Sequence, residues 1–235
     1  MIKFKPLASG SKGNCYHLTD GTTEILLECG IPIRKIREGL DFRLSSVAAC
    51  LVSHEHQDHA KAIADMMAAG IDVYASRGTI DALGLRGHRL HPIQALQGFE
   101  IGSSHSWYIL PFDLVHDAAE PLGFVCISGD ERLLFATDTA YVKYVVDGLT
   151  HICIECNYDE ETLSENVVQG KIDPALRQRI VENHMSLDRV KAMLSANDLS
   201  RVEEIWLLHL SDGNADAERF HKEIFWLTGR RVHVA

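Results

Sequence analysis

Leu51-Val52-Ser53-His54-Glu55-His56-Gln57-Asp58-His59-Ala60 is the stretch that decides the fold. It brings three histidines and one aspartate into six residues. The apolar run at 47–52 that precedes them indicates a buried strand. The segment 60–70 that follows is rich in small residues and methionine and has helical spacing. We therefore expect the four polar side chains on a turn between a strand and a helix, at the edge of a core.

The spacing of these side chains favours two metal ions. His54 and His56 are two residues apart and point the same way in an extended chain. Asp58 and His59 are adjacent, so we expect them to diverge and not to complete one coordination sphere easily. The first ion would then take His54 and His56, and the second Asp58 and His59. Imidazole and carboxylate ligands fit zinc, manganese or iron better than copper(I) or calcium.

A histidine-rich surface turn is the plain alternative, and it suits a lone histidine better than four ligand-type residues between a strand and a helix. The pattern also resembles the His-x-His-x-Asp-His signature of the metallo-β-lactamase superfamily. Membership in that superfamily implies a four-layer αββα hydrolase, with two mixed sheets face to face and helices outside.

Length and composition indicate one ordinary globular domain over residues 1–235. The chain is 46% hydrophobic and 24% charged, and no apolar run approaches the roughly eighteen residues of a membrane span. Residues 1–6 lack the apolar core of a signal peptide, so a cytosolic location without a membrane partner is expected. The oligomeric state is left open.

The six cysteines are scattered and mostly lie inside apolar runs. In a cytosolic chain they are expected to be reduced core thiols, and the single Cys153-x-x-Cys156 pair is a weak sign of a zinc or redox motif.

The net charge of −10 weakens a nucleic-acid partner without removing it. Nucleic-acid binders are usually basic because phosphate contacts dominate their affinity. An acidic protein can still cleave nucleic acid if metal ions and a local basic patch supply the positive field.

The rest of the chain alternates strands and helices, which predicts an α/β protein with two sheets. Strands are expected at 2–7, 15–18, 24–28, 47–52, 71–74, 98–101, 107–112, 123–128, 132–136, 152–155, 202–208 and 231–234. Helices are expected at 33–40, 60–70, 77–83, 160–169, 174–182, 187–196 and 214–227. Residues 84–92 are expected to form a loop, and 102–104 a turn.

Three later apolar strands stop at a residue that can bind a metal: His116, Asp138 and His209. They match the remaining metal motifs of the superfamily in order. By that resemblance His54, His56 and His116 hold the first metal, and Asp58, His59 and His209 the second. Asp138 would bridge the two ions.

Other motifs resemble the WalJ (YycJ) branch of bacterial and phage proteins. Residues 7–15 match its Ser-Gly-Ser-x-Gly-Asn opening, and 155–159 match its Glu-Ser-Asn-His-Asp. Residues 183–186 resemble its Gly-His-Leu-Ser, and 209–211 with Asn214 its closing motif. The branch implies an exonuclease that starts at five-prime ends. The chain departs from the pattern at Glu28, where the family usually has Asp, at Tyr158 in place of His, and at Asn183 in place of Gly.

The predicted mechanism is hydrolysis of a phosphodiester by a hydroxide that bridges the metals. Asp58, Asp138 and His184 are the predicted catalytic residues, with His184 as general acid or phosphate donor ahead of a helix that Ser186 can cap. A histidine that merely caps its own helix is the alternative. Glu28 is expected to hold a ligand from behind. Substrate or supporting roles are expected for the polar residues Ser9, Ser11, Asn14 and Asn214, although the first three can equally just form their turn.

The leading functional hypothesis is a dinuclear nuclease that trims DNA or RNA ends, with two zinc, manganese or iron ions. The runner-up is a hydrolase of a small ester, thioester, lactone or cyclic nucleotide, which the acidic charge would suit. A non-catalytic nucleotide-binding protein and a diiron redox protein are further alternatives. The non-catalytic protein would tolerate loss of metal ligands, and the diiron protein usually needs a flavin domain.

Overall fold

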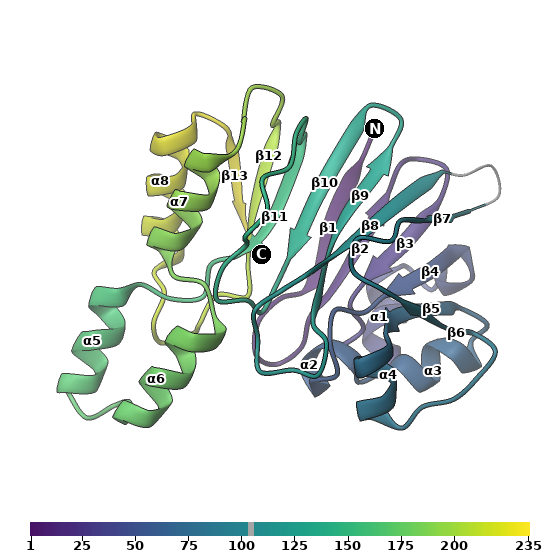
Figure 1. Cartoon of the computed structure of the whole chain (residues 1–235), viewed down its shortest axis with the longest axis horizontal. Helices are drawn as coiled ribbons and strands as arrows, with labels where there is room; N and C mark the ends of the chain where they lie inside the picture. Colours follow the sequence, from purple (N-terminus) through teal and green to yellow (C-terminus); the bar gives the residue numbers. More distant parts are fainter. Residues whose placement is uncertain (103–105) are drawn as a thin grey trace. The chain divides into compact units, whose positions relative to one another are not determined.

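The computed structural model describes residues 1–102 and 106–235, so the predicted turn at 102–104 lies partly outside the described residues. The chain forms two compact units, which are taken in turn (Figure 1). The first consists of Met1–Asp113 and Ala118–Glu131, and the second of Leu114–Asp117 and Arg132–Ala235. The single domain over 1–235 stays a prediction.

The first unit contains a six-stranded sheet whose strands follow their order in the sequence. They are β1 (Lys3–Ala8), β2 (Cys15–Thr19), β3 (Glu24–Leu27), β4 (Val47–Leu51), β5 (Asp72–Ser76) and β6 (Leu90–Ile93). Short turns make β1, β2 and β3 antiparallel, whereas β3 to β6 are parallel because each connection between them carries a helix. The core of this half is a cluster of buried side chains that includes Leu26, Cys50, Val73 and Met66.

Strand β6 corrects the predicted loop at 84–92. It contains Pro92, which lacks a backbone donor and lowers the strand signal in the sequence. The structure tolerates the proline because β6 is the last strand of its sheet and pairs only with β5.

The helices of the first unit are α1 (Ile33–Gly39), α2 (Gln57–Ala60), α3 (Ile63–Ala68) and α4 (Arg77–Leu83), with a 3-10 turn at Leu44–Ser46. Both α3 and α4 pack against β5. The single helix predicted over 60–70 is wrong in its start and continuity. Helical structure begins at Gln57 and breaks at 61–62, where Ala62 has φ −100° and ψ 13°.

The first unit also contains an antiparallel meander. Its strands are β7 (Phe99–Ile101), β8 (Trp107–Asp113) and β9 (Leu122–Ser128).

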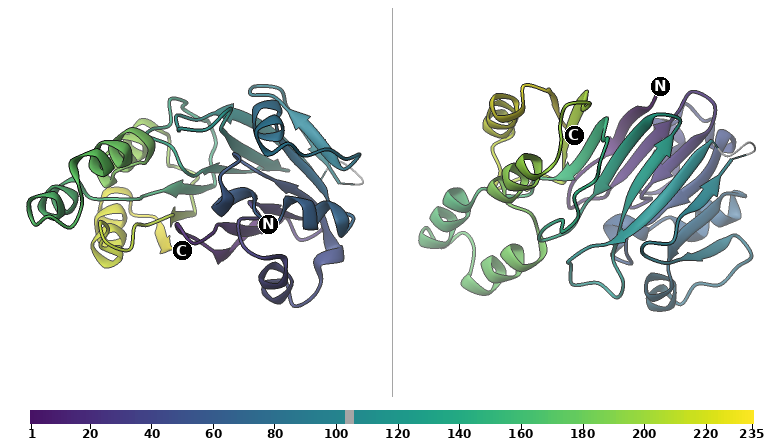
Figure 2. Two further views of the ribbon diagram at one scale, coloured as in Figure 1. Left: turned by 90° about the horizontal axis from the view of Figure 1, so that it is seen from below. Right: turned by 45° about the horizontal axis from the view of Figure 1, so that its top comes forward.

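The second unit contains four parallel strands and four helices. The strands are β10 (Glu131–Ala136), β11 (His151–Glu155), β12 (Glu204–Leu208) and β13 (Arg231–Val234), paired in that order. The helices are α5 (Glu160–Val168), α6 (Pro174–Asn183), α7 (Leu187–Ala196) and α8 (Ala217–Thr228). Figures 1 and 2 both show α7 and α8 together beside β12 and β13. The strands of the chain form two mixed sheets with helices, which confirms the predicted α/β class.

The cysteines lie in the interior, as expected for core thiols. All six cysteines are buried and free. Among the described residues, no helix has the length and apolar character needed to cross a membrane.

Candidate metal centre

The first unit gathers the histidines of the motif in the loop after β4. The His54 and His56 ring centroids are 4.6 Å apart, and those of His54 and His59 are 4.2 Å apart. His54 and His59 are fully buried, whereas His56 is partly exposed. The His54 and His56 rings therefore lie next to each other in the loop.

Asp58 and His59 do not diverge as expected. The Asp58 Oδ2 atom lies 3.4 Å from His59 Nε2. Adjacent side chains point in opposite directions in an extended chain, but both residues lie in the short helix α2, where successive side chains are about 100° apart. The pair can therefore approach one ion from the same side.

Backbone hydrogen bonds hold this loop against two other segments. The Asn14 N–H donates to the Asp58 carbonyl (2.7 Å), the Cys29 N–H to the His59 carbonyl (2.9 Å), and the Gly30 N–H to the Asn14 carbonyl (2.8 Å). A Cβ on Gly30 would lie 1.6 Å from the Asp58 carbonyl oxygen, so only glycine allows this approach.

The side chain of Asn14 also contacts the motif directly. It is fully buried, and its Nδ2 atom lies 3.1 Å from His59 Nε2 and 3.3 Å from the Asp58 carbonyl oxygen. Ser9 instead pairs with the Tyr16 hydroxyl at 2.9 Å, and Ser11 is an exposed turn residue. Of the three residues predicted in this turn, the structure brings Asn14 to the histidines.

Glu28 lies behind His59. It is fully buried with a φ of +66°, in the left-handed region that is uncommon for residues other than glycine. The Ser53 N–H lies 3.3 Å from both carboxylate oxygens, and Oε2 is 3.7 Å from His59 Nδ1. The longer arm of Glu28 therefore reaches the position from which a carboxylate orients a histidine.

The second unit has its own cluster of candidate ligands. Asp138, Glu155, His184 and His209 each offer one atom, and these atoms lie within 4.8 Å of one another. The cluster forms because β10, β11 and β12 are parallel neighbours, so the residues that follow each strand meet at one sheet edge. Asp138 and His209 have φ values of +44° and +53°, and such strained residues often occur at functional sites.

Glu155 connects the members of this cluster. Its Oε1 atom lies 2.7 Å from His184 Nδ1 and 3.0 Å from His209 Nδ1. Its Oε2 atom accepts the N–H groups of Thr139 (2.9 Å) and Met185 (3.2 Å). A carboxylate on the Nδ1 side of His209 leaves Nε2 as the nitrogen that can bind a metal.

The Glu155–His184 pair also shifts both pKa values. Burial alone would raise the pKa of Glu155 and lower that of His184. The mutual charge and hydrogen bond outweigh burial, so the pKa of Glu155 is lowered and that of His184 is raised. The pair therefore favours an ionised carboxylate beside a protonated imidazole.

His116 completes the second cluster. Its Nδ1 atom lies 3.0 Å from the Asn183 carbonyl oxygen, and its Nε2 atom 3.7 Å from Asp138 Oδ2. Burial lowers the pKa of His116, which favours the neutral ring that metal binding requires. The Val115 N–H donates to Thr139 Oγ1 (3.0 Å), so the loop that carries His116 is fixed beside Asp138.

Both donor sets suit a divalent metal ion. The first unit offers three imidazoles and a carboxylate, and the second offers imidazoles around the Asp138 carboxylate, with Glu155 behind them. Nitrogen and oxygen ligands of this kind, with further carboxylates outside, fit zinc, manganese or iron. The residues of the chain therefore fit the metals that the sequence predicts.

Glu155 and Asn157 have supporting roles that the sequence alone does not indicate. Asn157 Nδ2 donates to the His209 carbonyl at 2.8 Å and thereby supports the left-handed turn of that residue. The sequence signal for Glu155 is its place at the end of an apolar strand, since Asp138 and His209 also follow apolar strands. Asn214 lies farther along, where its side chain binds Asn166 and Ser211 and fastens the segment after His209 to α5.

The remaining predictions for this unit concern the residues around His184. His184 is the C-cap of α6, which ends at Asn183, and the Ser186 side chain accepts the Arg189 N–H and caps α7, as predicted. Tyr158 is fully buried and its backbone pairs with Ser186. Asn183 contacts His116 through its backbone carbonyl, which accepts a hydrogen bond from the ring. This contact does not require glycine at position 183.

Comparison with known proteins defines the class to which this fold and these clusters belong. Residues 23–210 match the family described as the β-lactamase superfamily domain. The chain is therefore a member of that superfamily of metal-dependent hydrolases, as the sequence predicts.

Two curated relatives identify the branch. The exodeoxyribonuclease WalJ of Streptococcus pneumoniae is 30% identical over 94% of this chain and 86% of its own length. The exodeoxyribonuclease YycJ of Bacillus anthracis is 29% identical over 91% of this chain and 84% of its own. The chain belongs to the WalJ/YycJ family.

Solved structures confirm the fold. The metallo-β-lactamase fold protein YhfI from Bacillus subtilis superimposes with a TM-score of 0.75 at 15% identity, covering 100% of this chain and 96% of that one. The short form of human tRNase Z gives a TM-score of 0.67 at 13% identity, with 100% and 96% coverage. The predicted metallo-β-lactamase fold is confirmed.

Proposed function

We propose that this chain is a dinuclear metal-dependent exonuclease that shortens DNA from its five-prime end. The observation that carries the proposal is the buried Glu155, which links His184 to the predicted ligand His209 at the end of parallel strands. The names of the curated relatives, both exodeoxyribonucleases, support DNA as the substrate. The predicted cytosolic location stays a prediction.

The proposed ligand sets are those of the superfamily pattern. His54, His56 and His116 would hold one ion, and Asp58, His59 and His209 the other, with Asp138 bridging. Zinc and manganese are the proposed ions, and iron is the third choice. When bound, a pair of such ions lowers the pKa of water from about 16 toward about 7 and neutralises charge on a phosphoryl group.

His184 is the proposed proton donor to the leaving oxygen. Its Nδ1 atom faces Glu155, which leaves Nε2 directed away from that carboxylate and able to carry a proton to substrate. Because the pKa of His184 is raised, the imidazole stays protonated to a higher pH than an ordinary histidine. Glu155 thus acts through His184 by orienting the ring and stabilising its charge.

The test is hydrolysis of single-stranded DNA with a five-prime phosphate by protein stripped of metal and refilled with manganese or zinc. We expect stepwise shortening from one end. Asp138→Ala should abolish it, whereas Asp188→Ala, at an exposed aspartate of the same unit, should leave it unchanged.

A small-molecule hydrolase is the second candidate, favoured by the net charge of −10. If fully loaded protein leaves DNA and RNA intact but cleaves a thioester, a lactone or a simple phosphodiester, this candidate replaces the nuclease. If no substrate is cleaved, a non-catalytic nucleotide-binding protein becomes the better account.

A further inference from the structure

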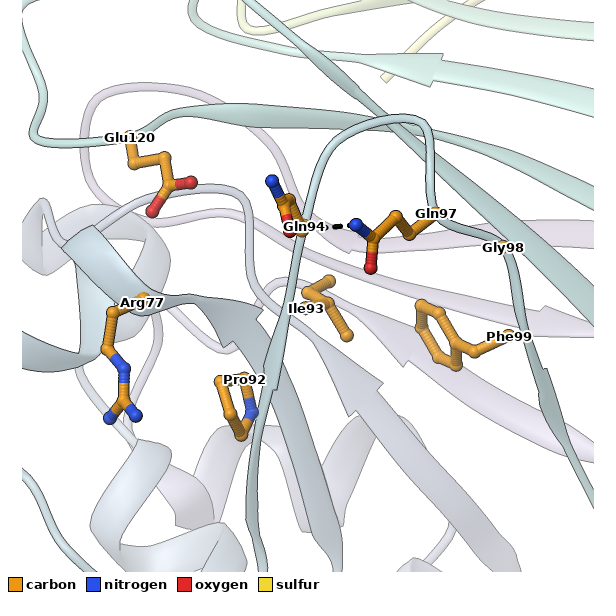
Figure 3. A pocket seen from close by; sticks show the side chains of 8 residues that line it. All are labelled: Arg77, Pro92, Ile93, Gln94, Gln97, Gly98, Phe99 and Glu120. Carbon is orange, nitrogen blue, oxygen red and sulfur yellow. Dashed lines mark hydrogen bonds between the residues drawn. The ribbon is translucent and has the colours of Figure 1, made fainter.

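A groove of about 600 Å³ opens on the first unit, and none of the candidate metal ligands lines it. It lies between the start of α4, the end of β6, the connection from β6 to β7, and residue 120 (Figure 3). Its lining combines apolar, amide and charged side chains: Arg77, Pro92, Ile93, Gln94, Gln97, Gly98, Phe99 and Glu120.

The aromatic ring of the groove is held in a fixed orientation. Phe99 stacks on Tyr74 with a centroid separation of 4.8 Å and an interplanar angle of 14°. Tyr74 in turn stacks on His91 at 4.8 Å and 24°. Figure 3 shows the Phe99 ring turned toward Ile93 in the groove. A fixed aromatic ring is the usual platform for a nucleobase of a single strand.

The groove lining also contains polar groups that can bind the base edge and the phosphate of a nucleotide. The amides of Gln94 and Gln97 face each other, and Gln97 Nε2 donates to Gln94 Oε1 at 2.9 Å. An amide pair has further donors and acceptors, which suit the edge of a base. The Arg77 side chain forms an exposed ion pair with Asp81 at 4.0 Å, is itself 69% exposed, and carries the planar fork that binds phosphate. Glu120 is the acidic residue of the lining and would repel a phosphate. The phosphate is therefore expected at Arg77.

Hydrogen bonds fasten the wall of the groove to the metal motif. Glu120 Oε2 accepts the Gly78 N–H at 2.7 Å. The neighbouring Ala119 N–H donates to Glu55 Oε1 at 2.8 Å, and Glu55 stands between His54 and His56. The Leu122 N–H donates to the Ser53 carbonyl at 3.0 Å. The groove and the histidine loop are therefore connected within one unit by the 118–122 segment.

We propose that this groove binds one nucleotide of a single-stranded DNA substrate. The base stacks on Phe99, its edge meets Gln94 and Gln97, and a phosphate pairs with Arg77. This inference rests on the proposed nuclease function and adds the site that holds the strand beside the metal motif.

The test measures binding and stacking directly. Metal-loaded protein is titrated with a phosphorothioate oligonucleotide, which resists hydrolysis, carrying 2-aminopurine at successive positions. Stacking on Phe99 should quench the fluorescence at one position. Phe99→Leu should remove that quenching and weaken binding about tenfold. Arg77→Ala should weaken binding severalfold and reduce its salt dependence.

Matched control variants distinguish a loss of binding at the groove from a general effect of removing an exposed aromatic ring or charge. Phe42→Leu and Arg86→Ala change exposed residues of the same unit outside the groove lining and should bind like the wild type. Thermal melting shows whether each variant is folded, and Arg77, being exposed, keeps the test informative if Phe99→Leu is unstable.

The outcomes distinguish this inference from the proposed function. If the wild type degrades DNA but Phe99→Leu and Arg77→Ala bind and quench like the wild type, the groove proposal is wrong and the nuclease stands. If DNA and bis(4-nitrophenyl) phosphate both stay intact with full metal occupancy, the nuclease fails. In that case loss of quenching in Phe99→Leu still supports a nucleotide site, and unchanged quenching overturns it.

Discussion

The two clusters of candidate ligands are built in different ways. In the first unit, four ligands lie within six consecutive residues and are held by backbone hydrogen bonds from Asn14 and Cys29. In the second unit, Asp138, Glu155 and His209 come from separate strand ends, His184 follows α6, and the side chain of Glu155 contacts both histidines.

This difference separates two ways of fixing a metal ligand. A contiguous motif depends on close backbone packing, and its carboxylate, Glu28, makes longer contacts of 3.3–3.7 Å. A dispersed cluster depends on a buried charge with several short hydrogen bonds. We therefore expect the first cluster to be sensitive to backbone crowding and the second to loss of a side-chain charge.

Removing one carboxylate from each cluster should have the largest effect on the rate of hydrolysis. Asp58→Ala and Asp138→Ala should each lower hydrolysis about a thousandfold or more, because an active-site metal contributes several kcal/mol to the transition state. If Asp138 bridges two ions, Asp138→Ala should also retain less metal than Asp58→Ala, as measured by elemental analysis of the purified proteins. Equal metal loss in both variants would argue against the bridging role.

Crowding the first cluster should destabilise the fold. A Cβ on Gly30 would meet the Asp58 carbonyl at 1.6 Å, so Gly30→Ala should reduce the free energy of unfolding by about 3 kcal/mol. A Cβ on Gly213 would meet no atom of the described residues within 4 Å, and Gly213→Ala should change stability by less than about 0.5 kcal/mol. Urea denaturation of both variants measures the contrast, and similar stabilities would contradict it.

Neutralising Glu155 or Glu28 should show which cluster depends more on its supporting carboxylate. Glu155→Gln should lower kcat about a hundredfold, because it loses the charge that holds His184 and His209. Glu28→Gln should cost about tenfold, since its contacts to Ser53 and His59 are longer. Steady-state kinetics on folded protein gives both values. A larger loss in Glu28→Gln would reverse the proposed roles of the two residues.

The same contrast explains how much the sequence could predict. The histidine motif and the strand-end residues His116, Asp138 and His209 are visible because ligand type and apolar runs are local properties. The end of an apolar strand marks Glu155 as a candidate, but its role depends on contacts with residues 29 and 54 positions away, which the strand pattern does not show. Strand β6 was missed because Pro92 is acceptable only at a sheet edge, and the edge is a property of the assembled sheet.

The smallest expected effect concerns two aspartates that stabilise the units through different partners. Asp159 caps α5 by accepting from Thr162 and pairs with Arg219 at 3.1 Å. The Asp20 side chain instead accepts the N–H groups of Thr22 and Thr23 and the Ser128 hydroxyl. Burial alone would raise the pKa of each carboxyl, but these hydrogen bonds, with the charge of Arg219 for Asp159, outweigh burial and lower it.

Because the folded pKa is lowered, each aspartate stabilises the fold above the unfolded pKa of about 3.9, and the contribution is lost as the pH falls through the folded value. Asp159→Ala and Asp20→Ala should each cost about 1 kcal/mol at pH 7 and much less near pH 2. Raising the salt concentration at pH 7 should shrink the cost of Asp159→Ala more, since that aspartate has the Arg219 ion pair to screen. Chemical denaturation at the two pH values and two salt concentrations measures this. Equal salt sensitivity would mean that the Arg219 pair contributes nothing to stability and that the cap of α5 accounts for the whole effect.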